Sequence, residues 1–345
     1  ATDADLPAQT LTYSIVGGAD AAKFAINTST GALSFATAPD YDAPTDSGAN
    51  NVYDVTVQAS DGALSSTKAI AVTVTAANDN TPVITSGATA NVAENTTAVM
   101  TVTATDADLP AQTLTYSIVG GADAAKFAIN ASTGVLSFLT APDFEAPTDS
   151  GANNVYDVTV QASDGAVSST EAIAVTVTAA NDNAPVITSG TTANVAENTT
   201  AVMTVTATDA DLPAQTLTYS IAGGADAAKF AINSSTGALS FLTAPDFEAP
   251  TDSGTNNVYD VTVQATDGTL SSTKAIAVTV TAANDNTPVI TSGATASVAE
   301  NTTAVMTVTA TDADLPAQTL TYSIVGGADA AKFAINASTG ALSFA

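Results

Sequence analysis

The chain has 345 residues, 45% of them hydrophobic, which is enough for roughly two to four domains with buried cores. It carries 34 acidic residues against 6 lysines and no arginine, so its formal charge of -28 argues against binding to nucleic acid or to an anionic membrane surface. Cysteine, histidine and tryptophan are absent, which excludes disulfides, zinc or haem ligation and histidine-based catalysis. No run of apolar residues is long enough to span a membrane.

Internal repeats decide the organisation of the chain. The string ATDADLPAQTLTYSI returns with a period of 103 residues, at Ala1, Ala104, Ala207 and Ala310. The copies differ only mildly, as where Tyr41 corresponds to Phe144. A period of this length is too long for a solenoid unit and matches one autonomous β-sandwich.

Within the second period, four segments alternate hydrophobic and polar residues and are predicted to be half-buried antiparallel strands, namely 98–104, 113–118, 155–162 and 172–177. Segment 122–127 resembles a short helical turn in a loop. Turn signals such as Gly120-Gly121 and Asp164-Gly165 separate the segments. We count about seven strands per period, which predicts an all-β fold of tandem seven-stranded Greek-key sandwiches.

The expected domain boundaries are the three Asn-Asp-Asn sequences, each followed after one residue by a proline. They divide the chain into a partial domain over 1–80 that lacks its first strands, complete domains over 81–183 and 184–286, and a partial domain over 287–345 that lacks its last strands. Because a sandwich cut in this way would have an open core, we expect the sequence to belong to a longer array. The alternative is that the two incomplete ends complement one another between chains.

Every period places acidic residues at the same offsets, in turns or at strand ends. In the second period they are Glu94, Asp106, Asp108, Asp143, Glu145 and Asp164, followed by the Asn-Asp-Asn linker. Calcium takes about 6–8 oxygen ligands from adaptable loops, so this pattern predicts calcium binding at the domain junctions. The plain alternative, an acidic surface that only keeps the chain soluble, explains the ordered pattern less well. We assign Asp123, Asp149, Asp157 and Lys126 to such a solvated surface.

Seven motifs occur in the same order in each full period: AEN, DAD, TLTYSI, FAINxSTGxL, DFE, ASDG (ATDG in the third period) and NDNxP. Together they resemble a cadherin repeat of the kind found in bacterial extracellular arrays, and the resemblance covers essentially the whole chain.

The resemblance implies that acids of one domain, the linker and acids of the next domain bind calcium together. The first junction would use Asp40, Asp42, Asn78, Asp79, Asn80, Asp106, Asp108 and Asp164. The middle junction would use Glu94, Asp143, Glu145, Asn181, Asp182, Asn183, Asp209, Asp211 and Asp267. The third would use Glu197, Asp246, Glu248, Asn284, Asp285, Asn286, Asp312 and Asp314. Asp3, Asp5 and Asp61 would face a junction upstream, and Glu300 one downstream.

The sequence departs from the family pattern at two kinds of position. An aspartate that usually precedes the first linker asparagine is replaced by Ala76, Ala179 and Ala282, which removes one ligand from each junction. Asp42 stands where the later periods have glutamate, so its carboxylate is one methylene shorter.

The function expected from these features is that of a non-enzymatic, calcium-stiffened extracellular stalk or filament, used for bacterial adhesion, biofilm formation or cell–cell contact. Its expected partners are calcium and other copies of the same repeats. The alternatives are a module that recognises a carbohydrate or an identical protein, or a fibre built by lateral packing or strand exchange. Paired carboxylates could also indicate a glycoside hydrolase, but the sequence offers no aromatic platform for a sugar.

Overall fold

The computed structural model describes all 345 residues, which form two compact units, Ala1–Ala180 and Asn181–Ala345. Each unit is described by itself. Apart from four three-residue 3-10 turns, all regular structure is β-strand. No helix is long and apolar enough to cross a membrane.

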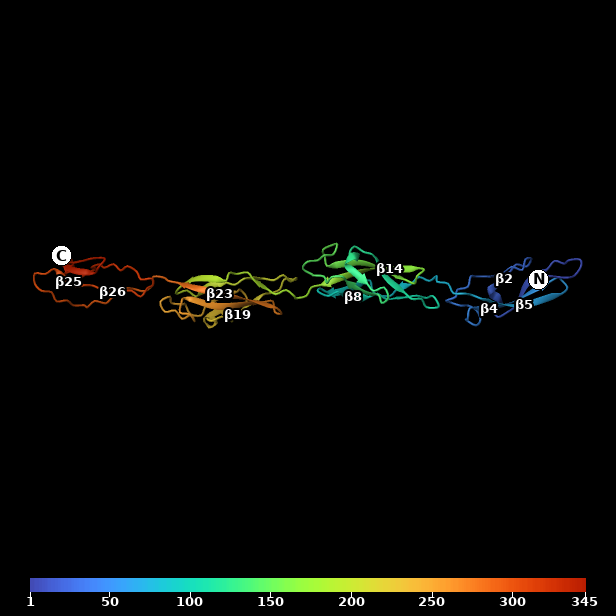
Figure 1. Cartoon of the computed structure of the whole chain (residues 1–345), viewed down its shortest axis with the longest axis horizontal. Coiled ribbons are helices and arrows are strands. Elements are labelled where there is room, and N and C mark those ends of the chain that lie inside the picture. Colours follow the sequence, from blue (N-terminus) through green and yellow to red (C-terminus); the bar gives the residue numbers. More distant parts are fainter. The chain divides into compact units, whose positions relative to one another are not determined.

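The second period shows the complete fold, and Figure 1 shows β8 and β14 within the same body. Its strands are β6 (Val83–Ile84), β7 (Thr89–Ala93), β8 (Ala98–Thr101), β9 (Ala104–Thr105), β10 (Thr115–Gly120), β11 (Phe127–Ile129), β12 (Val135–Phe138), β13 (Val155–Ser163) and β14 (Ser168–Thr178), with the turn η2 (Ala124–Lys126) before β11. Counting β6 with β7 and β8 with β9 as interrupted single strands gives the seven strands that the sequence predicts.

The strands form two layers. One is the four-stranded sheet β10-β13-β14-β7, in which β14 and β7 run parallel and the other pairs antiparallel. The other layer is the three-stranded sheet β11-β12-β8, and β6 and β9 form a separate two-stranded sheet. The connections cross between the layers, which confirms the predicted all-β Greek-key sandwich.

Alternation along the strands builds the core between the layers. Tyr156, Val158 and Val160 point inward from β13 and are buried, while Asp157 points outward. Phe127 stacks on Phe138 with ring centroids 4.5 Å apart, and Phe138 meets Tyr156 edge to face at 5.1 Å. Burial of this apolar surface is the main force that holds the sandwich together.

The predicted single strand over 98–104 is wrong in one respect, because the structure divides it into β8 and β9. β8 pairs with β12, whereas β9 pairs with β6, so the chain changes partner at the buried residue Val102. The Val102 amide donates to the Gly134 carbonyl at this crossing. Side-chain alternation continues through the break, which is why the sequence pattern does not reveal it.

The other predicted strands are present with shifted ends. β10 begins at Thr115 rather than at residue 113, because Thr115 pairs with Ser163, the last residue of β13. β14 is longer than the predicted 172–177, because it pairs with β13 along the whole length of that strand. The helical segment over 122–127 is the single turn η2.

The other periods repeat this order. The third has β15 (Val186–Ile187), β16 (Thr192–Ala196), β17 (Ala201–Thr204), β18 (Ala207–Thr208), β19 (Thr218–Gly223), η3 (Ala227–Lys229), β20 (Phe230–Ile232), β21 (Ala238–Phe241), β22 (Val258–Thr266) and β23 (Ser271–Thr281). The first has β1 (Thr12–Gly17), η1 (Ala21–Lys23), β2 (Phe24–Ile26), β3 (Leu33–Phe35), β4 (Val52–Ser60) and β5 (Ser65–Thr73). The fourth has β24 (Val289–Ile290), β25 (Ala304–Thr307), β26 (Ala310–Thr311), η4 (Ala330–Lys332), β27 (Phe333–Ile335) and β28 (Ala341–Phe344).

Candidate metal centre

The first predicted junction lies within the first unit, where the linker joins the first period to the second. The amide of Asn80 donates to Asp108 Oδ1 at 3.0 Å, and its side-chain Nδ2 donates to the same oxygen at 2.6 Å and to Asp42 Oδ2 at 3.0 Å. The Leu109 amide donates to Asp42 Oδ1 at 2.7 Å. Asp42 from the first period and Asp108 from the second are therefore held together by the linker.

Two groups of carboxylates meet at this junction and share the buried residue Asp108, which is 1% exposed. Asp42, Asp79 and Asp108 form one group, and Asp106, Asp108 and Asp164 form the other. In each group, one oxygen from every residue lies within 4.8 Å of the others. The structure thus brings together six of the eight residues predicted here: five acids in these two groups and Asn80.

Local turn geometry explains why these side chains face one another. The Asp108 amide donates to Asp106 Oδ1 at 3.0 Å, so the Asp-Ala-Asp sequence folds into a turn closed by its own first carboxylate. Asp164 closes a similar turn, because its Oδ1 accepts from the amides of Ala166 and Val167 at 2.7 and 2.9 Å. Asp106 Oδ2 remains buried with no hydrogen-bond partner.

The other two predicted residues have supporting contacts. Asp40 Oδ1 accepts from the amides of Asp42 and Ala43 at 2.9 and 3.3 Å, which orients the Asp42 segment. The Asn78 side chain hydrogen-bonds to Asp164.

The hydrogen bonds at this junction favour the ionised form of Asp108 and of Asp164. Burial raises the pKa of Asp108, but hydrogen bonds from the side chain and backbone of Asn80 outweigh burial, so the pKa lies below its usual value. Burial likewise raises the pKa of Asp164, and hydrogen bonds from Val167, Ala166 and Asn78 lower it further than burial raises it. The ion pair that the structure shows joins Lys332 to Asp329 at 3.0 Å and lies in the fourth period.

This donor set fits a hard divalent cation. The converging ligand atoms are carboxylate oxygens from five acids, and a buried oxygen of Asp106 lacks a hydrogen-bond partner. Calcium prefers oxygen ligands of this kind, supplied by loops.

The third predicted junction lies within the second unit and repeats the first. Asp314 Oδ1 accepts from the amide and side chain of Asn286 at 2.9 and 2.8 Å, and the Leu315 amide donates to Glu248 Oε1 at 2.9 Å. Glu248 Oε2 is buried without a hydrogen-bond partner. The side chain of Asn198 donates to Asp285 Oδ2.

The remaining predicted residues of this junction contribute turns. Asp246 Oδ1 accepts from the Glu248 amide at 2.9 Å, and Asp312 Oδ1 accepts from the Asp314 amide at 3.1 Å. Buried Glu197 accepts from the amides of Phe247 and Ala283, at 2.8 and 2.6 Å, and so fixes the start of the linker.

The residues predicted for the middle junction are divided between the two units, and each half is described alone. In the first unit Glu94, Asp143 and Glu145 form a carboxylate group with oxygens within 4.8 Å of one another. Buried Glu94 accepts from the amides of Phe144 and Ala180, at 2.7 and 2.6 Å.

In the second unit, Asp211 Oδ1 accepts from the amide and side chain of Asn183 at 3.1 and 2.8 Å. The Asn181 side chain hydrogen-bonds to Asp267, and Asp182 Oδ1 accepts from Asn183 Nδ2 at 3.0 Å. Asp209 Oδ1 accepts a hydrogen bond from the Asp211 amide at 3.1 Å, which closes the turn. Asp209 Oδ2 is buried without a hydrogen-bond partner.

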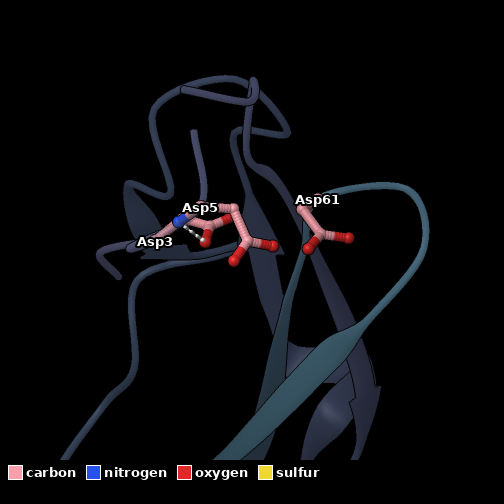
Figure 2. A group of neighbouring side chains, drawn as sticks. All are labelled: Asp3, Asp5 and Asp61. Atoms are coloured by element: carbon pink, nitrogen blue, oxygen red, sulfur yellow. Dashed lines mark hydrogen bonds between the residues drawn. The ribbon is translucent and has the colours of Figure 1, made fainter. Parts of the chain in front are cut away.

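The first period carries the same arrangement at Asp3, Asp5 and Asp61, whose oxygens also lie within 4.8 Å of one another. Figure 2 shows the carboxylates of Asp5 and Asp61 facing each other, with the Asp5 amide donating to Asp3 Oδ1 at 2.9 Å. The turns of a single period are therefore enough to bring these three carboxylates together.

Two residues assigned to the solvated surface are in fact buried, so that assignment is wrong for Asp123 and Asp149. Asp149 accepts three backbone amides at 3.0 Å, from Gly151, Asn153 and Asn154, and Asp123 accepts from the Ser150 amide at 2.7 Å. These bonds replace the water that an exposed carboxylate would keep.

The loop fixed in this way carries the predicted ligands Asp143 and Glu145. Its last residue, Asn154, has a positive φ of 62° and donates from its side chain to the Phe144 carbonyl at 2.9 Å. The signal that could have revealed this role is the run DSGANN, in which Asp and Asn favour turns closed by their side chains.

Comparison with known proteins gives a consistent result. The family model described as "Cadherin domain" matches residues 88–179 and 191–281, together just over half of the chain. Human protocadherin Fat 1 is 33% identical over 99% of this chain, which spans only 8% of the length of that relative.

Solved structures agree with the sequence matches. The chain resembles the "Protocadherin gammaB7 EC3-6 cis-dimer structure" with a TM-score of 0.63 and 26% identity, covering 100% of this chain and 85% of that one. It resembles mouse cadherin-23 EC22-24 with a TM-score of 0.57 and 26% identity, covering 81% of this chain and 88% of that one. The chain therefore belongs to the cadherin family and consists of cadherin domains in tandem.

Proposed function

We propose that this chain is a calcium-stiffened array of cadherin repeats that serves as an extracellular stalk or filament in adhesion. The observation that carries the proposal is the pair of carboxylate groups sharing Asp108, in which acids from two successive periods converge. The proposal divides the chain into partial domains over 1–80 and 287–345 and complete domains over 81–183 and 184–286.

The mechanism follows from the charges at the junction. Like charges this close repel one another, and the repulsion is strongest where burial keeps water away, as at Asp108. Bound calcium would supply the positive charge that oxygens from both periods coordinate together. Meanwhile the backbone of Leu109 and the side chain of Asn80 hold Asp42 and Asp108 in place, so the coordinating oxygens are ordered before any ion arrives.

The remaining sites follow by repeat equivalence. The residues predicted for the middle junction occupy the same sequence positions as those of the first junction, except Glu94, whose equivalent is Glu197 of the third. The turn at Asp209 and the bonds of Asn183 repeat those at Asp106 and Asn80. We therefore include Glu94, Asp143, Glu145, Asp182, Asp209, Asp211 and Asp267 as ligands in the proposal, together with the equivalent residues of the third junction.

Family membership supports both parts of the proposal. Cadherin domains bind calcium at the linkers between repeats, and proteins of this family are extracellular adhesion proteins rather than enzymes. We also propose a bacterial cell surface, in attachment or biofilm formation, as the setting, because the motifs resemble those of bacterial array-type repeats. Contacts with other copies of the repeats would then serve the adhesion.

A titration of the full chain with calcium, measured by isothermal titration calorimetry, tests the proposal. We expect saturable binding, and we expect Asp108→Asn to weaken the sites of the first junction by more than the roughly tenfold that an outer-shell partner contributes. The matched control is Asp157→Asn, because Asp157 is exposed on β13 outside the carboxylate groups. A chain that binds no calcium, or equal losses in both variants, would contradict the proposal.

A further inference from the structure

One strand position changes the sign of its charge between periods that are otherwise nearly identical. It is lysine in the first and third periods, as Lys68 and Lys274, and glutamate in the second, as Glu171. Glu171 and Lys274 hold the same place in their sheets, because Glu171 pairs with Val160 on β13 and Lys274 pairs with Val263 on β22. Glu171 is not among the ligands proposed for the junctions.

In the third period this lysine places a positive charge on two backbone carbonyls. Lys274 Nζ donates to the carbonyl oxygens of Ile187 and Ser189 at 3.1 and 2.6 Å. Ile187 is the last residue of β15, and β15 packs against β23, the strand that carries Lys274. The ammonium group is therefore a cation that connects the first strand of the sandwich to its last.

The second period presents the same backbone without the lysine. β6 contacts β14 as β15 contacts β23. The amides of Thr85 and Ser86 donate to the Thr103 carbonyl at 2.8 and 3.4 Å, and the equivalent bonds of the third period measure 2.8 and 3.3 Å. Because the Thr85 amide bonds across to Thr103, Ile84 takes a non-hydrogen-bonded position in the β6-β9 pair, and its carbonyl points away from β9.

Glu171 cannot satisfy these carbonyls as a lysine does. A carboxylate has no hydrogen to donate, and its negative charge is repelled by the partial negative charge of carbonyl oxygens. The hydroxyl oxygen of Ser86 is also buried without a hydrogen-bond partner, as is that of Ser189. A place that receives an ammonium group in the third period therefore gathers only oxygen acceptors in the second.

We propose that the second period binds a calcium ion between β6 and β14, at the place that the Lys274 ammonium group takes in the third. The ligands are the Glu171 carboxylate and the carbonyl oxygens of Ile84 and Ser86, with the Ser86 hydroxyl beside them. Glutamate is one atom shorter than lysine, and calcium–oxygen bonds of about 2.3–2.6 Å span that gap. Carboxylates and backbone carbonyls are ordinary calcium ligands, and water completes the coordination. The ion lies within one sandwich, so the site is independent of the junctions.

Counting the bound calcium tests this assignment. The full chain is dialysed to equilibrium against millimolar calcium, and the bound metal is measured by atomic absorption. We expect Glu171→Lys to bind about one ion per chain fewer than the parent, because the ammonium group takes the place of the ion. We expect Lys274→Glu to bind about one ion more, because it recreates the second-period site in the third period. An unchanged count in either variant overturns the inference.

Two controls separate a bound ion from a general effect of charge. Asp157→Lys makes the same change of charge at an exposed position of β13, and Lys274→Gln removes the ammonium group without supplying a carboxylate. Neither should change the count, and a change equal to that of the matched variant overturns the inference. Thermal melting gives a second measurement. Calcium should restore to Lys274→Glu part of the stability that this variant loses in chelator, beyond any gain in Lys274→Gln, and equal gains in both overturn the inference.

Discussion

The third and fourth periods have nearly the same sequence up to residue 345 but differ in how far their cores are closed. Ile187 of the third period is 7% exposed, whereas its counterpart Ile290 in the fourth is 66% exposed. In the third period, β22 and β23 supply buried residues such as Tyr259 and Ile276. The fourth has no counterpart of these strands within the 345 residues, and an open cavity of about 940 Å³ is lined by core positions such as Ile290, Phe333 and Leu342.

The comparison also shows that neighbouring strands determine which segments become strands. The sequence of β19 recurs almost unchanged at 321–326, yet that segment forms no strand in the fourth period. β19 pairs with β22, which has no counterpart among the 345 residues. Strand formation therefore depends on the partner strand and on burial more than on intrinsic propensity.

The largest expected effect comes from opening the third core at Tyr259, which is 1% exposed and contacts the rings of Phe230 and Phe241. Tyr259→Ala removes this ring and should lower the free energy of unfolding of that domain by about 3–5 kcal/mol. Calorimetric melting of the full chain would show one transition shifted to lower temperature. Val325→Ala is the control, because Val325 is 98% exposed in the open period and its loss should cost less than about 0.5 kcal/mol.

A smaller effect is expected at buried Asp252, which accepts the amides of Gly254, Asn256 and Asn257 at 3.0, 2.9 and 3.0 Å. Asp252→Ala leaves these donors without an acceptor and should cost about 2 kcal/mol. Denaturation of the full chain in chelator would measure the loss apart from calcium. A variant as stable as the parent would show that the loop is held by other contacts.

The same residue makes a prediction about pH. Burial raises the pKa of Asp252, but its backbone hydrogen bonds outweigh burial and hold the pKa below the ordinary value of 3.8. Because the pKa of Asp252 is lower in the folded than in the unfolded chain, its ionised carboxylate stabilises the fold at pH values above the unfolded pKa. This contribution is lost as the pH falls through the lowered pKa of the folded state. The stability difference between parent and Asp252→Ala should therefore shrink below about pH 4. A difference that stays constant to lower pH would contradict this assignment.

The smallest effect is expected at Lys274 on β23 of the third period. Lys274 Nζ donates to the carbonyls of Ile187 and Ser189 at 3.1 and 2.6 Å, while the second period has Glu171 at this position. Lys274→Glu should destabilise the third domain by about 1 kcal/mol, since a carboxylate cannot donate to these carbonyls. Glu171→Lys is the reciprocal variant, and equal melting shifts of the same sign in both would contradict the explanation.

Patterns within short stretches allowed much of the fold to be predicted. Alternation along β13 is enough to assign Tyr156, Val158 and Val160 to the core, and all three are buried. The division of 98–104 into β8 and β9 could not be predicted, because it arises from pairing with strands elsewhere in the sequence.

The candidate site divides in the same way. Asp106 and Asp108 could be singled out from their spacing, since that spacing closes a local turn. The burial of Asp149 could not, because it depends on where distant segments fold back. A turn sequence such as DSGANN is equally compatible with an exposed loop and with a buried carboxylate.

Small-angle X-ray scattering of the full chain, in millimolar calcium and then in excess chelator, tests the central claim most directly. If carboxylates from successive repeats share calcium, the chain has a longer maximum dimension and a narrower distance distribution in calcium than in chelator. Adding chelator should shorten the maximum dimension and broaden the distribution, and renewed calcium should reverse both changes. Identical scattering in the two conditions, from a chain shown to bind calcium, would contradict the claim that the metal stiffens the joints.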